Sequence, residues 1–238
     1  MTETLRHRAS APPGAAANTD AVPALRARPA GPVAAAERPR ARDEGMRGQI
    51  LKAAAALFRR QGFERTTVQS IADAVGLKKG SLYHYITGKQ RLLFEILQHA
   101  LEDSLPELER IAAGDAPAAE RLREAVGLHI LTLARDRDNV ACFLEEGRWL
   151  APEYRAAHQA TRDRYEALFR RIVADGVYAG EFAPTDVRLA GFAVLGIVNW
   201  VVRWYQPAGQ YRAEQIADEF GDYAVGALGG ARRRDGRA

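Results

Sequence analysis

The segment of residues 66–89 carries four residues at a spacing that constrains the fold of the whole chain. Ala72 is followed four positions later by Gly76, and then by Leu82 and Tyr85. Two helices that cross steeply need a small residue at the crossing, and a glycine can end the first helix in a left-handed conformation. The segment therefore predicts a helix-turn-helix, in which the second helix enters the major groove of DNA.

The same segment divides into a packing face and an outward face. Thr66 and Gln69 have the spacing of a capping box, which would start the first helix. The residues expected to pack inward recur at helical spacing: Val68, Ile71, Ala72, Val75 and Leu82. The residues expected to contact DNA offer donors to phosphates and base edges: Thr66, Thr67, Lys78, Lys79, Gly80, Ser81, Tyr83, His84, Tyr85 and Lys89. The alternative is an ordinary helical hairpin with a solvated basic face.

This part of the chain resembles the DNA-binding domain of TetR-family transcriptional regulators. A helix expected over residues 48–60 and closed by Gly62 precedes the motif, and a further helix opens with Lys89 and Leu92. The close resemblance covers residues 46–100. It implies an all-α fold, with an N-terminal three-helix helix-turn-helix domain and a larger helical domain for ligand binding and dimerisation.

Charge is segregated along the chain. Residues 46–91 hold nine lysines and arginines against two acidic residues, whereas residues 92–230 hold fourteen against twenty-two. A basic segment attracts the DNA backbone, and an acidic remainder avoids binding phosphate elsewhere. We therefore expect a helix-turn-helix domain over 46–91, a ligand-binding and dimerisation domain over 92–230, and double-stranded DNA as a partner.

The two ends of the chain differ from the rest in composition. Residues 1–45 hold six of the eleven prolines and seven arginines, with few large apolar residues. Such a segment cannot bury enough surface to offset its ordering entropy, so it predicts a disordered tail. This tail either adds weak nonspecific DNA affinity or is dispensable. Residues 231–238 predict a short basic disordered tail.

Cysteine usage and hydropathy indicate the compartment. The single cysteine, Cys142, excludes an intrachain disulfide and suits a reducing cytoplasm. The N-terminus lacks the continuous apolar stretch of a secretory signal. The longest uncharged apolar run, residues 189–202, is shorter than the roughly 20 residues of a membrane span. We expect a cytoplasmic bacterial protein with no membrane partner.

No stretch of strand length alternates between apolar and polar residues, so residues 92–230 are expected to be helical throughout. Residues 189–202 are apolar on nearly every face of their helix and need cover on every face. This helix and the last one, from about residue 213, resemble the pair that forms the four-helix dimer interface in TetR-family proteins. The resemblance implies a homodimer that reads a palindromic operator.

Four residues are candidates for a small-molecule site: Trp149, Asn199, Arg203 and Trp204. Apolar walls with a few polar groups are typical of ligand sites, although such aromatic residues also fill ordinary cores. The string NWVVRWYQPAG, residues 199–209, resembles the penultimate helix of a TetR subgroup that represses fatty-acid and steroid catabolism genes and responds to acyl-CoA. The resemblance implies an acyl-CoA or another hydrophobic small molecule as effector.

The sequence does not indicate an enzyme. The five histidines show no metal-ligand spacing, and no glycine-rich loop for phosphate is present. We therefore expect no catalytic residue, no metal and no cofactor. The expected function is that of a repressor released by its ligand. A transcriptional activator of the same fold, or a regulator without a small-molecule effector, is the alternative.

Overall fold

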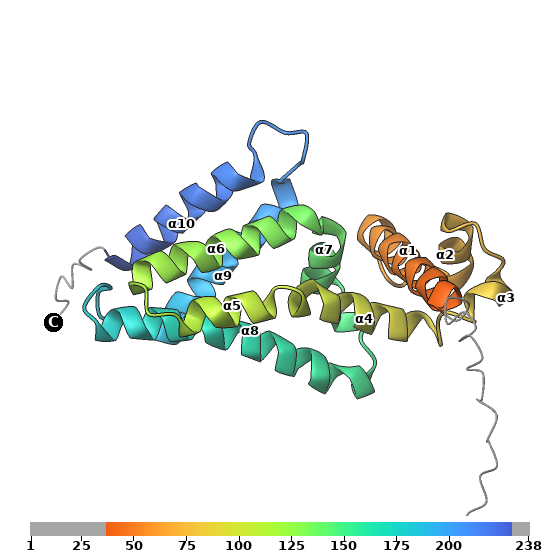
Figure 1. Cartoon of the computed structure of the whole chain (residues 1–238), viewed down its shortest axis with the longest axis horizontal. Helices are drawn as coiled ribbons and strands as arrows, with labels where there is room; N and C mark the ends of the chain where they lie inside the picture. The colour runs from red at the N-terminus through yellow and green to blue at the C-terminus, as the bar shows by residue number, and fades with distance from the viewer. Residues whose placement is uncertain (1–36, 230–238) are drawn as a thin grey trace, which may run out of the picture.

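A computed structural model describes residues 37–229, and all regular structure in this range is helical. The elements are α1 (Glu37–Gln61), α2 (Val68–Ala74), α3 (Lys79–Leu82), α4 (Lys89–Glu102), α5 (Leu105–Ala113), α6 (Ala118–Arg135), α7 (Arg137–Glu145), the short 3₁₀ turn η2 (Gly147–Trp149), α8 (Pro152–Tyr178), α9 (Val187–Trp204) and α10 (Ala213–Gly229). Figure 1 shows α1, α2 and α3 together at one end, here called the head, and α5 to α10 at the other, here called the body. The all-α prediction is confirmed.

The first helix begins earlier than the sequence suggests. Residues 37–45, expected in the N-terminal tail, belong to α1. Once the packed part of a helix has formed, each added residue needs no new nucleus, and Pro39 falls in the first turn, where proline is tolerated. The disorder predicted for residues 1–36 and 231–238 lies outside the described residues.

The head is built around one apolar cluster. Ile50 and Phe58 of α1, Ile71 and Ala72 of α2, and Leu82 of α3 are fully buried in it. The small side chain of Ala72 lies among these larger side chains. The inward packing predicted for these positions on α2 and α3 therefore agrees with the structure.

The capping box of α2 lies one residue later than predicted. Thr67, not Thr66, is the N-cap: its hydroxyl oxygen accepts from the Ser70 N–H at 3.0 Å, and the Ser70 hydroxyl oxygen accepts from the Thr67 N–H at 3.1 Å. Gly76 follows α2 with a φ of +70°, a conformation that favours glycine. The turn between the two helices thus forms where the spacing predicts it.

Helix α4 connects the head to the body. Its residues Leu92, Leu93, Ile96 and Leu97 belong to the apolar cluster of the head, whereas Leu101 belongs to the cluster of the body. The domain boundary expected between residues 91 and 92 therefore falls in a helix that serves both parts. Pairs of apolar residues three and four apart give α4 a continuous buried face, so the sequence pattern does not mark where one core ends and the next begins.

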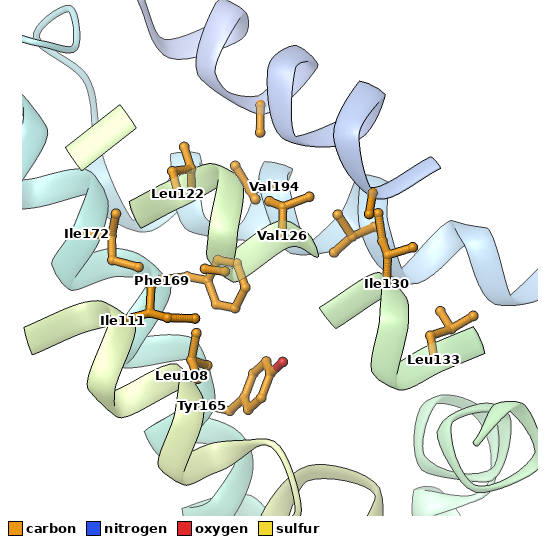
Figure 2. Packing of buried hydrophobic residues seen from close by; sticks show 14 of the residues in the cluster. Leu108, Ile111, Leu122, Val126, Ile130, Leu133, Tyr165, Phe169, Ile172 and Val194 are labelled. Carbon is orange, nitrogen blue, oxygen red and sulfur yellow. The ribbon is translucent and has the colours of Figure 1, made fainter. Parts of the chain in front are cut away.

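The core of the body lies between α5, α6, α8 and α9. Figure 2 shows Leu108 and Ile111 of α5, Val126 of α6, and Phe169 and Ile172 of α8 meeting side by side. Each of these side chains is at most 1% exposed. α10 packs along α6, and Figure 1 shows it as an outer layer of the body.

Helix α9 is only partly covered. It is 18 residues long and apolar enough, by length and composition, to cross a membrane, and 33% of it is buried inside the body. The regular helix is longer than the uncharged run on which the sequence argument relied. Its exposed face carries large apolar side chains at helical spacing: Leu189 (64% exposed), Phe192 (45%), Ile197 (47%), Trp200 (63%) and Trp204 (39%). An exposed apolar stripe of this kind is typical of an interaction surface.

The packing around Gly176 generates a prediction about stability. A Cβ atom at this position of α8 would lie 2.2 Å from the Phe182 ring and 2.9 Å from the Ala118 side chain. We expect Gly176→Ala to lower the free energy of unfolding by about 1–3 kcal/mol, because both neighbours are buried. Urea unfolding followed by circular dichroism, at one fixed protein concentration, measures the change.

Gly48→Ala is the matched control. Gly48 also lies in a helix, but a Cβ atom there meets nothing within 4 Å. We expect this variant to be as stable as the wild type or up to about 1 kcal/mol more stable, because alanine is the better helix former. Equal unfolding midpoints for the two variants would contradict the packing argument.

Candidate nucleic-acid interface and ligand cavity

The outward face of α3 and the turn after it present polar groups to solvent. Lys78, Lys79, Gly80, Tyr83 and His84 are exposed, and the Tyr83 side chain is 49% exposed although it is large and aromatic. Ser81 and Tyr85 are half-buried, and Thr67 is exposed at the start of α2. The structure thus brings eight of the ten predicted DNA-contacting residues to one end of the molecule.

The other two predicted DNA contacts, Thr66 and Lys89, have structural roles instead. Thr66 is fully buried, and its hydroxyl donates to the carbonyl of Gly62 at 2.8 Å. The Lys89 ammonium donates to the carbonyls of Phe63, Glu64 and Thr66 at 2.8, 3.4 and 2.9 Å. An ammonium group has three donors, so none is left for phosphate. Both residues hold the loop between α1 and α2, and partial burial of the ammonium lowers the pKa of Lys89.

The body contacts the head through α7 and η2. Glu146, buried between them, accepts a hydrogen bond from the Phe63 N–H at 3.2 Å. The thiol of Cys142 donates to the carbonyl of Ala55 in α1 at 3.3 Å, and burial raises the pKa of this thiol to about 12. At neutral pH the thiol is therefore protonated, as a donor must be. Two polar contacts thus join α7 to α1 and its following loop inside an apolar layer.

Further polar contacts surround this junction. Arg59 of α1 pairs with Asp138 of α7 at 2.5 Å. Gln90 of α4 donates to the carbonyl of Trp149 and accepts from the N–H of Ala151, both at 3.0 Å. These contacts link α7 and η2 to α1, to α4 and to the loop before α2.

A cavity of about 80 Å³ lies in the body. Its walls mix polar and apolar side chains, and its lining residues are Ala100, Leu101, Ser104, His129, Thr132, Val140, Phe143, Leu144, Arg162, Tyr165, Glu166, Leu195 and Asn199. Ser104, His129 and Tyr165 are among the most buried polar residues of the described chain. A cavity with buried donors and acceptors on its walls fits a ligand that carries its own polar group.

A shallower groove opens beside the cavity. It encloses about 550 Å³ and is lined by Leu144, Glu145, Glu146, Arg148, Gly196, Asn199, Trp200, Val202 and Arg203. Leu144 and Asn199 line both the cavity and the groove, so the two spaces lie side by side at these residues. Arg203 pairs with Glu145 at 2.5 Å, and Arg148 lies over the Trp149 ring at 5.4 Å. The groove therefore offers guanidinium groups next to a partly apolar cavity.

The structure separates the four residues predicted to bind a ligand. Asn199 lies where the cavity and the groove meet, and Arg203 lines the groove. Trp149 and Trp204 line neither, and both predictions are corrected. Trp149 packs against the apolar cluster of the head, because η2 turns its side chain that way. Trp204 is 39% exposed and lies 6.3 Å from the Phe220 ring of α10, on the uncovered face of the body.

His129 and Tyr165 were not predicted from the sequence as residues of this site. The His129 ring accepts or donates at 3.0 Å to the Tyr165 hydroxyl through Nδ1 and to the Asn199 Oδ1 through Nε2. Desolvation lowers the pKa of His129 to about 4, so its imidazole is neutral at physiological pH. The signal was present: His129 continues the apolar stripe of Leu122 and Val126 on α6, and a histidine on such a stripe needs buried partners.

Comparison with known proteins gives the family. Residues 50–96 match the family described as "Bacterial regulatory proteins, tetR family", and residues 115–228 match "Tetracyclin repressor-like, C-terminal domain". The repressor KstR2 of Rhodococcus jostii (strain RHA1) is 31% identical over 179 residues, which are 74% of this chain and 87% of that protein.

Solved structures agree with this assignment. The TetR-family regulator PfmR from Thermus thermophilus is 37% identical, with a TM-score of 0.69 over 74% of this chain and 96% of that one. AibR, solved with isovaleryl coenzyme A and operator DNA, is 31% identical, with a TM-score of 0.68 over 77% of this chain and 97% of that one. The chain belongs to the TetR family, and it is a DNA-binding transcriptional regulator rather than an enzyme.

The exposed face of α3 generates a prediction about DNA binding. We expect Tyr83→Ala to weaken specific operator binding at least about tenfold, because each lost base contact costs about 1–3 kcal/mol. Tyr178→Ala is the matched control, since Tyr178 is 96% exposed at the end of α8 in the body. A gel shift measures both affinities, and light scattering checks that the oligomeric state is unchanged. Wild-type affinity in Tyr83→Ala would remove this residue from the contact face.

The neutral state of His129 generates a prediction about pH. Its pKa is about 4 in the folded protein and about 6.5 in an unfolded chain. Between these values the unfolded chain binds a proton that the folded protein does not, so the free energy of unfolding falls as pH falls from 6.5 toward 4. We expect a loss of about 2 kcal/mol at pH 5 relative to pH 8 from this residue.

Urea unfolding of the wild type and of His129→Gln at the two pH values isolates this contribution, because other acidic groups titrate equally in both proteins. His99→Gln, which removes an exposed histidine of α4, is the control and should keep the wild-type dependence. The same loss of stability at pH 5 in His129→Gln and the wild type would show that His129 does not cause it.

Proposed function

We propose that this protein is a cytoplasmic bacterial repressor that binds a palindromic operator as a homodimer and leaves it when an acyl-CoA thioester binds in the body. The observation that carries the effector class is the cavity that meets a groove at Leu144 and Asn199. An acyl-CoA has an acyl chain at one end and phosphates at the other. The cavity suits the chain, and Arg148 and Arg203 suit the phosphates.

The relatives support this effector class. AibR, whose structure contains isovaleryl coenzyme A and operator DNA, shares the fold of this chain over 77% of its length. Another relative, 25% identical over 155 residues, is the fatty acid metabolism regulator protein of Bacillus subtilis (strain 168). What these proteins bind or regulate becomes a proposal for this chain because the groove carries two guanidinium groups, Arg148 and Arg203, beside the acidic Glu145 and Glu146.

The homodimer is proposed from the uncovered face of α9 and α10. The exposed apolar stripe of α9 includes Trp200 and Phe192, and Tyr223 of α10 is 60% exposed. One short α3 can read only a few base pairs. A two-fold symmetric pair places two heads about 34 Å apart, which matches successive major grooves on one side of a palindrome. The same dimer covers the apolar stripe.

The release mechanism follows from the position of α7. α7 and η2 line the groove through Leu144, Glu145 and Arg148, and Glu146, which also lines the groove, accepts a hydrogen bond from the Phe63 N–H of the head. A ligand that moves α7 therefore acts on the loop before α2, as well as on α4, which packs against α7. The ligand can weaken DNA binding only to the extent that it binds the released conformation more tightly than the DNA-binding conformation. A hundredfold release requires a preference of about 2.7 kcal/mol.

Gel shift with DNA upstream of the protein's own gene, with and without a panel of acyl-CoA esters, tests the proposal. We expect a complex on a palindromic site that dissociates at least about tenfold more readily with one class of ester. Free coenzyme A and free fatty acid are the controls, because each carries only half of the proposed recognition. No complex on any palindrome would contradict the repressor, and a complex unaffected by every ester would contradict the effector.

Two further readouts complete this experiment. Glu146→Ala leaves the Phe63 N–H without its acceptor, so we expect the variant to bind the ester but to release DNA less completely than the wild type. Transcription in vitro from the bound promoter distinguishes a repressor from an activator. Transcripts that increase when the regulator is added would favour the activator.

A further inference from the structure

We propose that Asn199, held in one orientation by His129 and Tyr165, donates a hydrogen bond to the thioester carbonyl of the effector, and that the cavity behind it accepts only a short acyl chain. This inference rests on the proposed function, because it assumes a CoA thioester. It assigns the specificity of the site to three polar side chains on α6, α8 and α9.

The position of Asn199 is the first step. Of the residues that line the cavity, only Asn199 and Leu144 also line the groove. An acyl-CoA that places its chain in the cavity and its phosphates in the groove must pass its thioester between the two. Leu144 has no polar side-chain atom, so Asn199 is the residue at this passage that can recognise a carbonyl oxygen.

The orientation of the Asn199 amide is the second step. Its Oδ1 lies 3.0 Å from the His129 Nε2, and the His129 Nδ1 lies 3.0 Å from the Tyr165 hydroxyl. A neutral imidazole has one N–H and one lone pair. If Nε2 carries the hydrogen and donates to Oδ1, then Nδ1 accepts from the Tyr165 hydroxyl, and every group has a complementary partner. The two N–H donors of the Asn199 Nδ2 are then directed away from His129 and remain for a ligand.

The rigidity of this chain of hydrogen bonds is the third step. The His129 ring meets the rings of Tyr165 and Phe169 edge-on, with centroids 5.8 and 6.4 Å apart. His129 and Tyr165 are also buried, at 7% and 4% exposure. Burial keeps His129 neutral, as its lowered pKa of about 4 indicates, so the donor and acceptor order does not reverse at physiological pH. The amide is thereby fixed before a ligand arrives, which improves discrimination.

The size of the cavity is the fourth step. A water-sized group needs roughly 10–15 Å³ of such volume. The 80 Å³ cavity therefore holds about five to eight such groups. This suits an acyl chain of about four to six carbons, whereas a long fatty acyl chain or a fused ring system would have to displace the lining side chains. We therefore expect a short-chain acyl-CoA to be the effector that binds most tightly.

Isothermal titration of the full-length dimer with three CoA derivatives tests the inference. Butyryl-CoA is the thioester, S-butyl-CoA is the thioether that lacks only the carbonyl oxygen, and palmitoyl-CoA is the long chain. We expect butyryl-CoA to bind at least about tenfold more tightly than both others. A site built to hydrogen-bond a group rejects the analogue that lacks it, because its buried donor is left unpaired.

Variants separate the contact from its positioning. Asn199→Ala removes the donor, so it should bind the thioester and the thioether equally. His129→Phe keeps a ring in place but frees the amide to rotate. His129→Phe should therefore lose most of the preference for butyryl-CoA over S-butyl-CoA, while its affinity for S-butyl-CoA stays at the wild-type value. Tyr165→Phe should lose less of this preference than His129→Phe does. The infrared carbonyl band of ¹³C-labelled butyryl-CoA should shift on binding to the wild type and not to Asn199→Ala, a signature that loss of packing alone would not produce.

The outcomes distinguish the inference from the function on which it depends. If none of the three derivatives binds, the proposed effector class itself is wrong. If butyryl-CoA and S-butyl-CoA bind the wild type equally, the effector class stands and the carbonyl contact fails. If palmitoyl-CoA binds as tightly as butyryl-CoA, the limit on chain length fails. A thioether that binds more tightly than the thioester would show that the amide oxygen, rather than Nδ2, faces the ligand.

Discussion

The apolar contact between α1, α4 and α7 is the interaction on which the rest of the structure depends. Phe58 and Ile96 share one buried cluster with Cys142 and Leu150, so the head does not have a core independent of the body. A close-packed interior changes between discrete arrangements rather than deforming smoothly. Helix α7, which lines the cavity, therefore packs directly against α1 and α4.

The cavity of the body carries polar groups on walls that are otherwise apolar. The cavity places a neutral histidine, a tyrosine and an asparagine in a chain of hydrogen bonds where a purely apolar pocket would suffice for an alkyl chain. Buried polar groups are retained only when they are satisfied, and they then discriminate strongly among ligands. The same groups make the protein less stable at low pH, because His129 must stay uncharged. Stability at low pH and the ligand selectivity proposed above thus depend on the same side chain.

Local patterns in the sequence predicted what local geometry decides. The spacing of Ala72, Gly76 and Leu82 predicted the turn and the crossing of α2 and α3, and the stripe on α4 predicted its buried face. The misplaced contacts were those that depend on distant parts of the chain. Lys89 and Thr66 looked free to bind DNA, but Phe63, Glu64 and Gly62 supply carbonyls that occupy them. Trp204 looked like part of a pocket, but its helix turns it outward.

The sequence by itself determined the fold class, the helix-turn-helix and the basic character of residues 46–91, because helical periodicity, glycine and charge are properties of short segments. Only the tertiary structure decided that His129, Tyr165 and Asn199 meet, and that Glu146 joins the body to the head. These residues are separated by 36 to 83 positions along the chain. A hydrogen bond over such a separation depends on how whole helices pack, and residue spacing within any one helix carries no record of it.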